Sequence, residues 1–214
     1  MLVKTYSAAV NGLEVTPVTI EVSITKGIVY HLTGLGDGAV KEGRDRIAAA
    51  MLHNNFHFPR ADITVNMAPA DLKKEGSSFD LPLAIGILAA DGQIVTPTLN
   101  QYMMVGELSL DGNLQPAKGV LPIAIMARAK HYKGLIVPKE NVREAAIVNT
   151  LEVYGMESMM DVIKFLSGEA HYEPTLIDTR KEFYEHQYNF DLDFADVRGQ
   201  ENVKRALEVA AAGG

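Results

Sequence analysis

"KGLIVPKENVREAAIVNTLEVYGMESMMDVIKFLSG", residues 133–168, contains two short apolar runs, each followed by a stretch with helical spacing. The runs "KGLIVP" and "LEVYGM" are rich in branched and aromatic residues and have the length of buried strands. "KENVREAAIV" and "SMMDVIKFLSG" place apolar residues three and four positions apart, as one face of a helix requires. This alternation predicts a mixed α/β domain in which helices pack on a sheet.

The first third of the chain adds strands and then two helices. From Val3 to about Thr33 the sequence is rich in Val, Ile, Thr and Tyr, and a turn signal at Lys26-Gly27 predicts a β-meander. Helical spacing then begins after Asp37, a residue suited to the N-cap, and ends near Asn54-Asn55. "ADITVNMAP" predicts a further strand, and Leu81–Ala90 a short apolar helix.

The sequence divides into three parts. Residues 1–168 form the predicted α/β domain, and residues 169–196 carry acids and aromatics without a sustained period, which indicates an inter-domain linker. In residues 197–214, "VRGQENVKRALEVAAAGG" predicts one helix from about Gln200 to Ala212. One helix cannot bury a core by itself. It therefore either docks on the preceding domain or begins a second domain that continues past Gly214.

Composition excludes several classes of function. The chain has no cysteine, which excludes disulfides, thiolate metal sites and thiol catalysis. The net charge of −7 opposes a broad electrostatic grip on DNA, although a local basic edge is compatible with it. The sequence has neither an apolar run of membrane-spanning length nor a signal-peptide pattern, so we expect a cytoplasmic protein without membrane partners.

The loop "KKEGSSFDLP", residues 73–82, contains a serine that could have either a structural or a catalytic role. Ser78 precedes an apolar helix, where a serine can cap free N–H groups or attack a carbonyl if a base lies within reach. Asp80 is an equally good cap before Leu81-Pro82. On the residues alone, capping or loop hydrogen bonding is the favoured role for Ser78.

Two other patterns have simpler explanations. His53 and His57 stand four apart, as zinc ligands do on a helix, but no third ligand is evident, so no metal site is predicted. "GLGDG" lacks phosphate-binding spacing, and a turn is the better interpretation. No G-x-x-x-x-G-K-(S/T) string occurs between Met1 and Gly214, so these residues are not expected to hold or hydrolyse ATP.

"KKEGSSFDLPLAIGILAA", followed by "MVGELSLDGNLQPAKGVLPIAIMARAKHYKGLIVPKEN", resembles the proteolytic domain of Lon peptidases over most of residues 60–168. The resemblance implies the fold of that domain, a mixed sheet with packed helices of the type of the second domain of ribosomal protein S five. It also matches Ser78 to the nucleophilic serine. The position of the general-base lysine is Leu121, which cannot accept a proton. Lys118 is one helical turn earlier and displaced, so peptidase activity is not expected.

The Lon-like part, the linker and "DFADVRGQENVKRALEVAAAGG" together resemble the Mg-chelatase-like AAA+ ATPases of bacteria, the YifB/ComM family, over nearly the whole chain. In that family the last motif opens the ATPase module just before its Walker A loop. The resemblance implies that residues 197–214 are the start of an AAA+ domain. It also implies that the full-length protein is an ATPase that uses ATP and Mg2+ as a hexameric ring.

Relatives in that family are implicated in remodelling branched DNA during natural transformation, which implies a substrate-engaging or assembly role for residues 1–168. The resemblance to related DNA-repair ATPases suggests a basic edge that contacts branched or single-stranded DNA, for which the candidates are Lys41, Arg44, Arg46, Lys73 and Lys74. A solvated face explains the same residues equally well. Two alternatives stay open, an ATP-dependent Lon-like serine peptidase with an atypical base and a purely structural ring-assembly domain.

Overall fold

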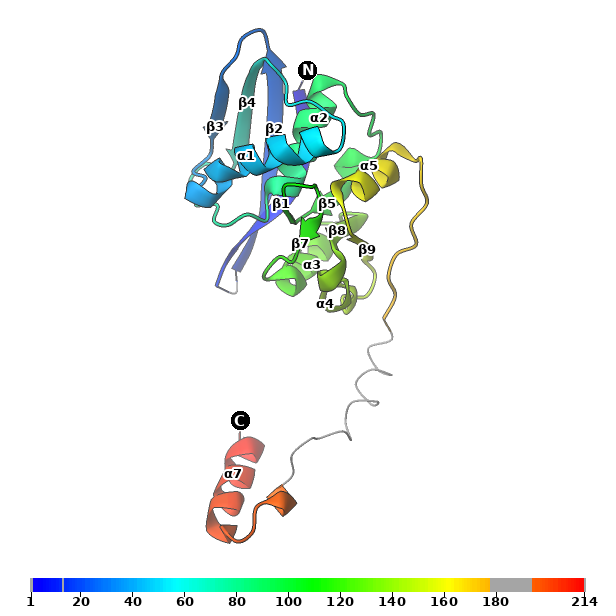
Figure 1. The fold of residues 1–214 in the computed structure, drawn as a ribbon. Coiled ribbons are helices and arrows are strands. Elements are labelled where there is room, and N and C mark those ends of the chain that lie inside the picture. Colours follow the sequence, from blue (N-terminus) through cyan, green and yellow to red (C-terminus); the bar gives the residue numbers. More distant parts are fainter. Residues whose placement is uncertain (1, 13, 178–193, 214) are drawn as a thin grey trace. The chain divides into compact units, whose positions relative to one another are not determined.

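The structure is a computed structural model that describes residues 2–12, 14–177 and 194–213 (Figure 1). It divides into two compact units, Met1–Ile177 and Asp178–Gly214, which are considered separately. The strands of the first unit are β1 (Leu2–Asn11), β2 (Glu14–Thr25), β3 (Tyr30–Thr33), β4 (Asp62–Ala68), β5 (Tyr102–Met104), β6 (Glu107–Leu108), β7 (Leu114–Gln115), β8 (Gly134–Pro138) and β9 (Glu152–Met156). Its α-helices are α1 (Gly38–His53), α2 (Asp80–Asp91), α3 (Val120–Ala129), α4 (Val142–Ala146) and α5 (Met159–Ser167).

A seven-stranded mixed sheet organises the first unit, in the order β3-β4-β2-β1-β5-β8-β9. β1 is antiparallel to β2, and β2 is antiparallel to β4. On the other side of β1 the strands β5, β8 and β9 follow in parallel register. β6 and β7 form a separate two-stranded ladder. The mixed α/β fold predicted from the sequence is therefore confirmed.

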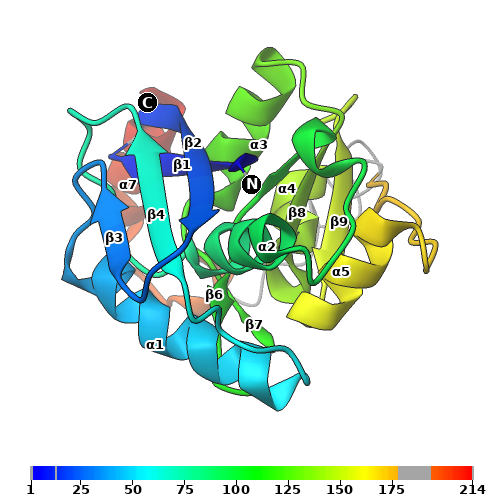
Figure 2. The same ribbon diagram turned by 90° about the horizontal axis from the view of Figure 1, so that it is seen from above.

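Helices cover both faces of the sheet (Figure 2). α1, α2 and α5 share one apolar core with the inward residues of β2 and β4, whereas α3 and α4 share a second core with β5 and β8. All of β8 is buried because helices lie on both of its faces, as is usual for parallel strands. On β2 and β4 buried and less buried positions alternate instead over most of their length, because one face of these strands packs on the core shared with α1 and α2.

The predicted β-meander is wrong in one respect. β1 and β2 form the expected hairpin, but β3 pairs in parallel with β4, which lies between β3 and β2. The alternate residues Ile63, Val65 and Met67 of β4 are all buried in the core. Asp62 then fixes the approach of β3 by accepting a hydrogen bond from the Val29 amide at 2.8 Å.

The two helices that border the candidate site begin and end near the predicted residues. Asp37 is the N-cap of α1 and accepts a hydrogen bond from the Val40 amide at 2.9 Å, while Asn54 follows its last turn. α2 is almost wholly buried and stops at Gly92, whose φ of 79° lies in the left-handed region that glycine adopts readily. Both predictions are confirmed.

The sequence predicts that the α/β domain ends at Gly168. In the structure the first unit extends to Ile177. Thr175 donates its N–H to the Val153 carbonyl at 2.8 Å, and the Tyr172 hydroxyl donates to Asp161 at 3.0 Å. These contacts attach residues 169–177, which the sequence assigns to the linker, to β9 and α5. Of the rest of the predicted linker, residues 178–193 lie outside the described residues.

The second unit contains a short 3-10 helix (Phe194–Asp196) and the helix α7 (Glu201–Gly213), one residue from the predicted range. The side chains of Val203 and Leu207 lie on one stripe of α7, and both are about half exposed. In the part of the chain that the structure describes, no helix has the length and apolar character needed to cross a membrane.

Candidate functional site

A cavity of about 790 Å3 lies where β1 runs past the end of β5. Its walls come from residues 8–10 of β1, residues 75–78 before α2, Glu107 of β6 and residues 116–119 before α3. The cavity therefore contains the serine pair of the loop that resembles Lon, together with Lys118. Four charged side chains line it: Asp37, Glu75, Glu107 and Lys118.

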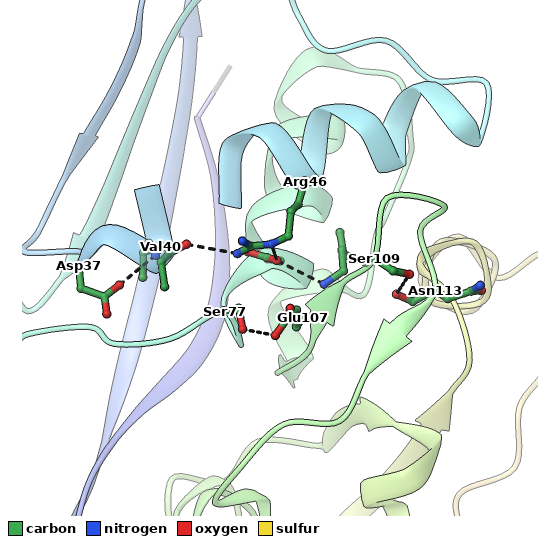
Figure 3. Close-up of polar contacts among 10 residues, drawn as sticks. Asp37, Val40, Arg46, Ser77, Glu107, Ser109 and Asn113 are labelled. Carbon is green, nitrogen blue, oxygen red and sulfur yellow. Dashed lines mark hydrogen bonds and ion pairs between the residues drawn. The ribbon is translucent and has the colours of Figure 1, made fainter. Parts of the chain in front are cut away.

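The wall formed by residues 75–78 is fixed through its neighbour Lys74. The Lys74 amide donates to the Leu35 carbonyl at 3.1 Å, and the Lys74 carbonyl accepts from the Asp37 amide at 3.0 Å. Asp37 adds a further bond, because its second carboxylate oxygen accepts from the Gly76 amide at 3.2 Å. One aspartate thus caps α1 (Figure 3) and, through the Gly76 amide, holds the loop against it.

Lys74 itself is fully buried, and its ammonium Nζ donates to the Pro69 carbonyl. Burial lowers the pKa of Lys74, and Asp71 opposes that shift only in part. A lysine in this position is hydrogen-bonded inside the loop and does not present its charge at the surface.

An ion pair joins α1 to the first turn of α2. Arg46 donates to the buried carboxylate of Asp80 from Nε at 2.7 Å and from one terminal nitrogen at 3.1 Å. Asp80 also accepts from the Leu108 amide at 3.3 Å, which holds β6 against the two helices. Burial raises the pKa of Asp80, while the bonds from Arg46 and Leu108 act in the opposite direction.

The capping role expected for Ser78 or Asp80 is wrong. The N-cap of α2 is Phe79, and no side chain accepts a hydrogen bond there. Asp80 is occupied by Arg46 instead. Ser78 lines the cavity half-buried, and it contributes its carbonyl, which accepts from the Gly106 amide at 2.9 Å. Within the described residues its hydroxyl has no hydrogen-bond partner.

The neighbouring serine, Ser77, is hydrogen-bonded to an acidic side chain. The Ser77 hydroxyl donates to the Glu107 carboxylate across the cavity (Figure 3). Lys118 lines the same cavity, but in the described part of the chain no hydrogen bond joins it to Ser78. Leu121, at the position of the Lon lysine, packs half-buried against the core of α3 and α4. A serine without an aligned base is not an activated nucleophile.

The five basic residues proposed for DNA do not share one surface. Arg46 is bound to Asp80, and Lys74 is buried. Lys73 is exposed but pairs with Glu75. Arg44 lies 5.7 Å from the ring centres of both Tyr30 and Phe58, and Lys41 is exposed. DNA contact therefore remains a prediction. Of the five residues, only Lys41, Arg44 and Lys73 are exposed and available for it.

Sequence reasoning missed Glu107 and assigned Arg46 to a surface. One signal was available for the ion pair: Asp80 stands alone in the apolar run "FDLPLAIGILAA", and a buried acid needs a cationic partner. Glu107 offered no such signal, because an acid in a short strand is normally exposed. Among the described residues, no three His, Asp or Glu side chains gather as metal ligands would, and His57 pairs with Asp91 at 3.2 Å.

Residues 20–141, more than half of the chain, match the family model described as subunit ChlI of Mg-chelatase. The chain belongs to the Mg-chelatase ChlI family. This ChlI-family chain is 43% identical to the competence protein ComM of Haemophilus influenzae over 213 residues, which cover 97% of the chain and 41% of ComM. It is 38% identical to the uncharacterized protein YifB of Escherichia coli over 98% of the chain and 40% of YifB.

A more distant similarity bears on the cavity. The ChlI-family chain is 29% identical to a Lon protease of Protochlamydia amoebophila over 124 residues, which are 54% of the chain and 14% of that protease. The predicted relation to ComM and YifB is thus confirmed, and the relation to Lon is partial. The chain spans about two fifths of the length of ComM and YifB.

Proposed function

We propose that the chain is the amino-terminal domain of a longer Mg-chelatase-like AAA+ ATPase, a cytoplasmic motor that remodels branched DNA in a competence-related process. The domain engages the substrate or assembles the hexameric ring, and its fold is that of the Lon proteolytic domain, of the ribosomal protein S five second-domain type. The observation that carries the proposal is the similarity to ComM, which continues over 97% of the chain.

The residues of this chain do not supply the nucleotide site of such a motor. A nucleotide needs the backbone amides and lysine of a Walker A loop, and the sequence has no G-x-x-x-x-G-K-(S/T) string. In the proposed motor, ATP and Mg2+ would be held by a Walker A loop, which is not among residues 1–214. What the chain contributes is the cavity, the sheet and the exposed cations Lys41 and Arg44.

The test is ATP hydrolysis by the product of the whole gene, measured without DNA, with single-stranded DNA and with a four-way junction. Junction stimulation is expected, and it should be lost when residues 2–177, the compact first unit, are deleted. The double substitution Lys41→Gln and Arg44→Gln should weaken junction binding without changing hydrolysis in the absence of DNA. Equal hydrolysis in every condition would exclude the DNA role.

A second candidate is a Lon-like serine peptidase with an atypical base, favoured by one observation: Ser78 and Lys118 line the same cavity. Lys118 is exposed, and a displaced base loses most of the benefit of a positioned proton acceptor. ATP-dependent casein cleavage that disappears in Ser78→Ala would support this candidate. Concentration-dependent assembly without DNA affinity would favour a purely structural ring-assembly domain.

A further inference from the structure

One edge of β1 is free beside the cavity. β1 pairs with β5 only at Tyr6 and Met103, and β5 ends one residue later. The chain then turns toward α2, where the Gly106 amide donates to Ser78 and the Gly106 carbonyl accepts from Leu81. In the described chain no strand borders residues 8–11 of β1 on that side.

A free edge of this kind is a template for another strand. Residues 8–11 remain paired with β2 on their other side, so alternate residues turn their N–H and C=O groups toward the cavity. At about 3.3 Å per residue, this unpaired stretch is as long as roughly four residues of an extended peptide. Val10 and Asn11 are exposed, whereas Ala8 and Ala9 are almost wholly buried where they line the cavity. Main-chain hydrogen bonds to such an edge give affinity, and side-chain pockets beside it give specificity.

The charges around this edge favour a cationic side chain. Three carboxylates line the cavity, against the single ammonium of Lys118. Asp37 is engaged by two backbone amides, and Glu75 is paired with Lys73. Glu107 receives one hydroxyl, from Ser77, which leaves carboxylate lone pairs for a further donor. A phosphate backbone would meet repulsion from the same three groups.

We propose that the cavity binds an extended polypeptide segment as an added strand on β1 and holds a Lys or Arg side chain of that segment against Glu107. The inference does not depend on DNA binding, because neither Lys41 nor Arg44 lines the cavity. On this proposal the cavity recognises a partner protein and does not cleave it, because Ser78 has no aligned base.

The test begins by selecting short random peptides on the immobilised 214-residue chain at low salt. Bound peptides should share a Lys or Arg at one position within an alternating apolar pattern. The best peptide is then synthesised with a fluorescent label, and its affinity is measured by anisotropy. Glu107→Gln keeps an acceptor for Ser77 but removes the charge, so it should weaken binding roughly threefold to tenfold. Glu169→Gln, an exposed acid outside the cavity, should leave affinity unchanged.

Strand pairing is tested on the peptide, so the protein fold is not at risk. N-methylation of alternate amides should weaken binding about tenfold or more in one register and hardly at all in the other, because only one set of N–H groups faces β1. Failure to select any cationic peptide, or equal effects of Glu107→Gln and Glu169→Gln, would overturn the proposal. Displacement of the peptide by single-stranded DNA, with DNA binding lost in Lys118→Gln, would assign the cavity to nucleic acid instead.

Discussion

Arg46 of α1 and Asp80 of α2 form a two-point ion pair whose carboxylate side is almost wholly buried. The pair lies beside the cavity, and through the Leu108 amide it also fixes β6, the strand that carries Glu107. The two sequence segments are distant, so this contact connects the loop before α2 to the rest of the fold.

Asp80→Asn should destabilise the protein by about 2–4 kcal/mol, because it leaves the guanidinium without its charge partner while Arg46 keeps some solvent contact. Urea unfolding at neutral pH measures the change. The double variant Arg46→Met with Asp80→Leu should recover most of the loss, since no buried charge remains. As a matched control, Glu157→Gln breaks the exposed pair with Lys139 and should cost less than about 1 kcal/mol. Equal losses in Asp80→Asn and Glu157→Gln would contradict this account.

Gly43→Ala should destabilise the packing of α1 on α2. A Cβ at Gly43 would lie 2.5 Å from the Asp80 carboxylate, so the helix must move or the ion pair must open, at a cost of about 1–3 kcal/mol. Gly38→Ala is the matched control in the same helix, because nothing lies within 4 Å of its Cβ position. That control should be neutral or stabilising by about 0.5–1 kcal/mol. Thermal unfolding of both variants decides the matter, and a Gly43→Ala protein as stable as Gly38→Ala would contradict the prediction.

Lys74 should make stability depend on alkaline pH. Its folded pKa lies below the ordinary value of 10.5, so the unfolded chain binds the proton more tightly. Stability attributable to this residue is therefore lowest below the folded pKa and rises as pH increases toward 10.5. We expect wild type to gain free energy of unfolding relative to Lys74→Met between pH 7 and pH 10, measured by urea titration. A difference that is flat or of opposite sign would show that the ammonium is not desolvated.

The serines of the cavity should not react as peptidase nucleophiles. A fluorophosphonate reagent labels an activated serine, and Ser78 has no hydrogen-bonded base in the described structure. Wild type and Ser78→Ala should therefore remain equally unlabelled, whereas a serine peptidase in parallel is labelled. Labelling of wild type that disappears in Ser78→Ala would show that Lys118 or another group reaches the hydroxyl.

The sequence predicted local elements better than their partners. Asp37 as a cap and Gly92 as a stop follow from short-range backbone chemistry, so α1 and α2 could be located without the fold. The insertion of β4 between β2 and β3 could not, because hydrophobic alternation shows which face is buried but not which strand lies alongside.

The candidate site shows the same limit. The Lon resemblance located Ser78, Lys118 and Leu121, but the hydroxyl that finds an acid is that of Ser77, whose partner Glu107 lies in another element. Arg46 and Lys74 were assigned to a basic edge because the sequence reports charge and not burial. Their partners, Asp80 and the Pro69 carbonyl, become neighbours only through tertiary packing.

The position of β1 in the sheet has a consequence for how the chain is built during synthesis. β1 to β4 and the first two helices are complete by Asp91, and every pairing among these four strands joins segments that have already been translated. β5, β8 and β9 then join one beside another in chain order, so the sheet can grow outward without rearranging earlier strands. β5 pairs with only part of β1, so the rest of that edge of β1 has no neighbouring strand in the described chain. The unpaired remainder thus lies between the part of the sheet that is translated first and the part that is translated last.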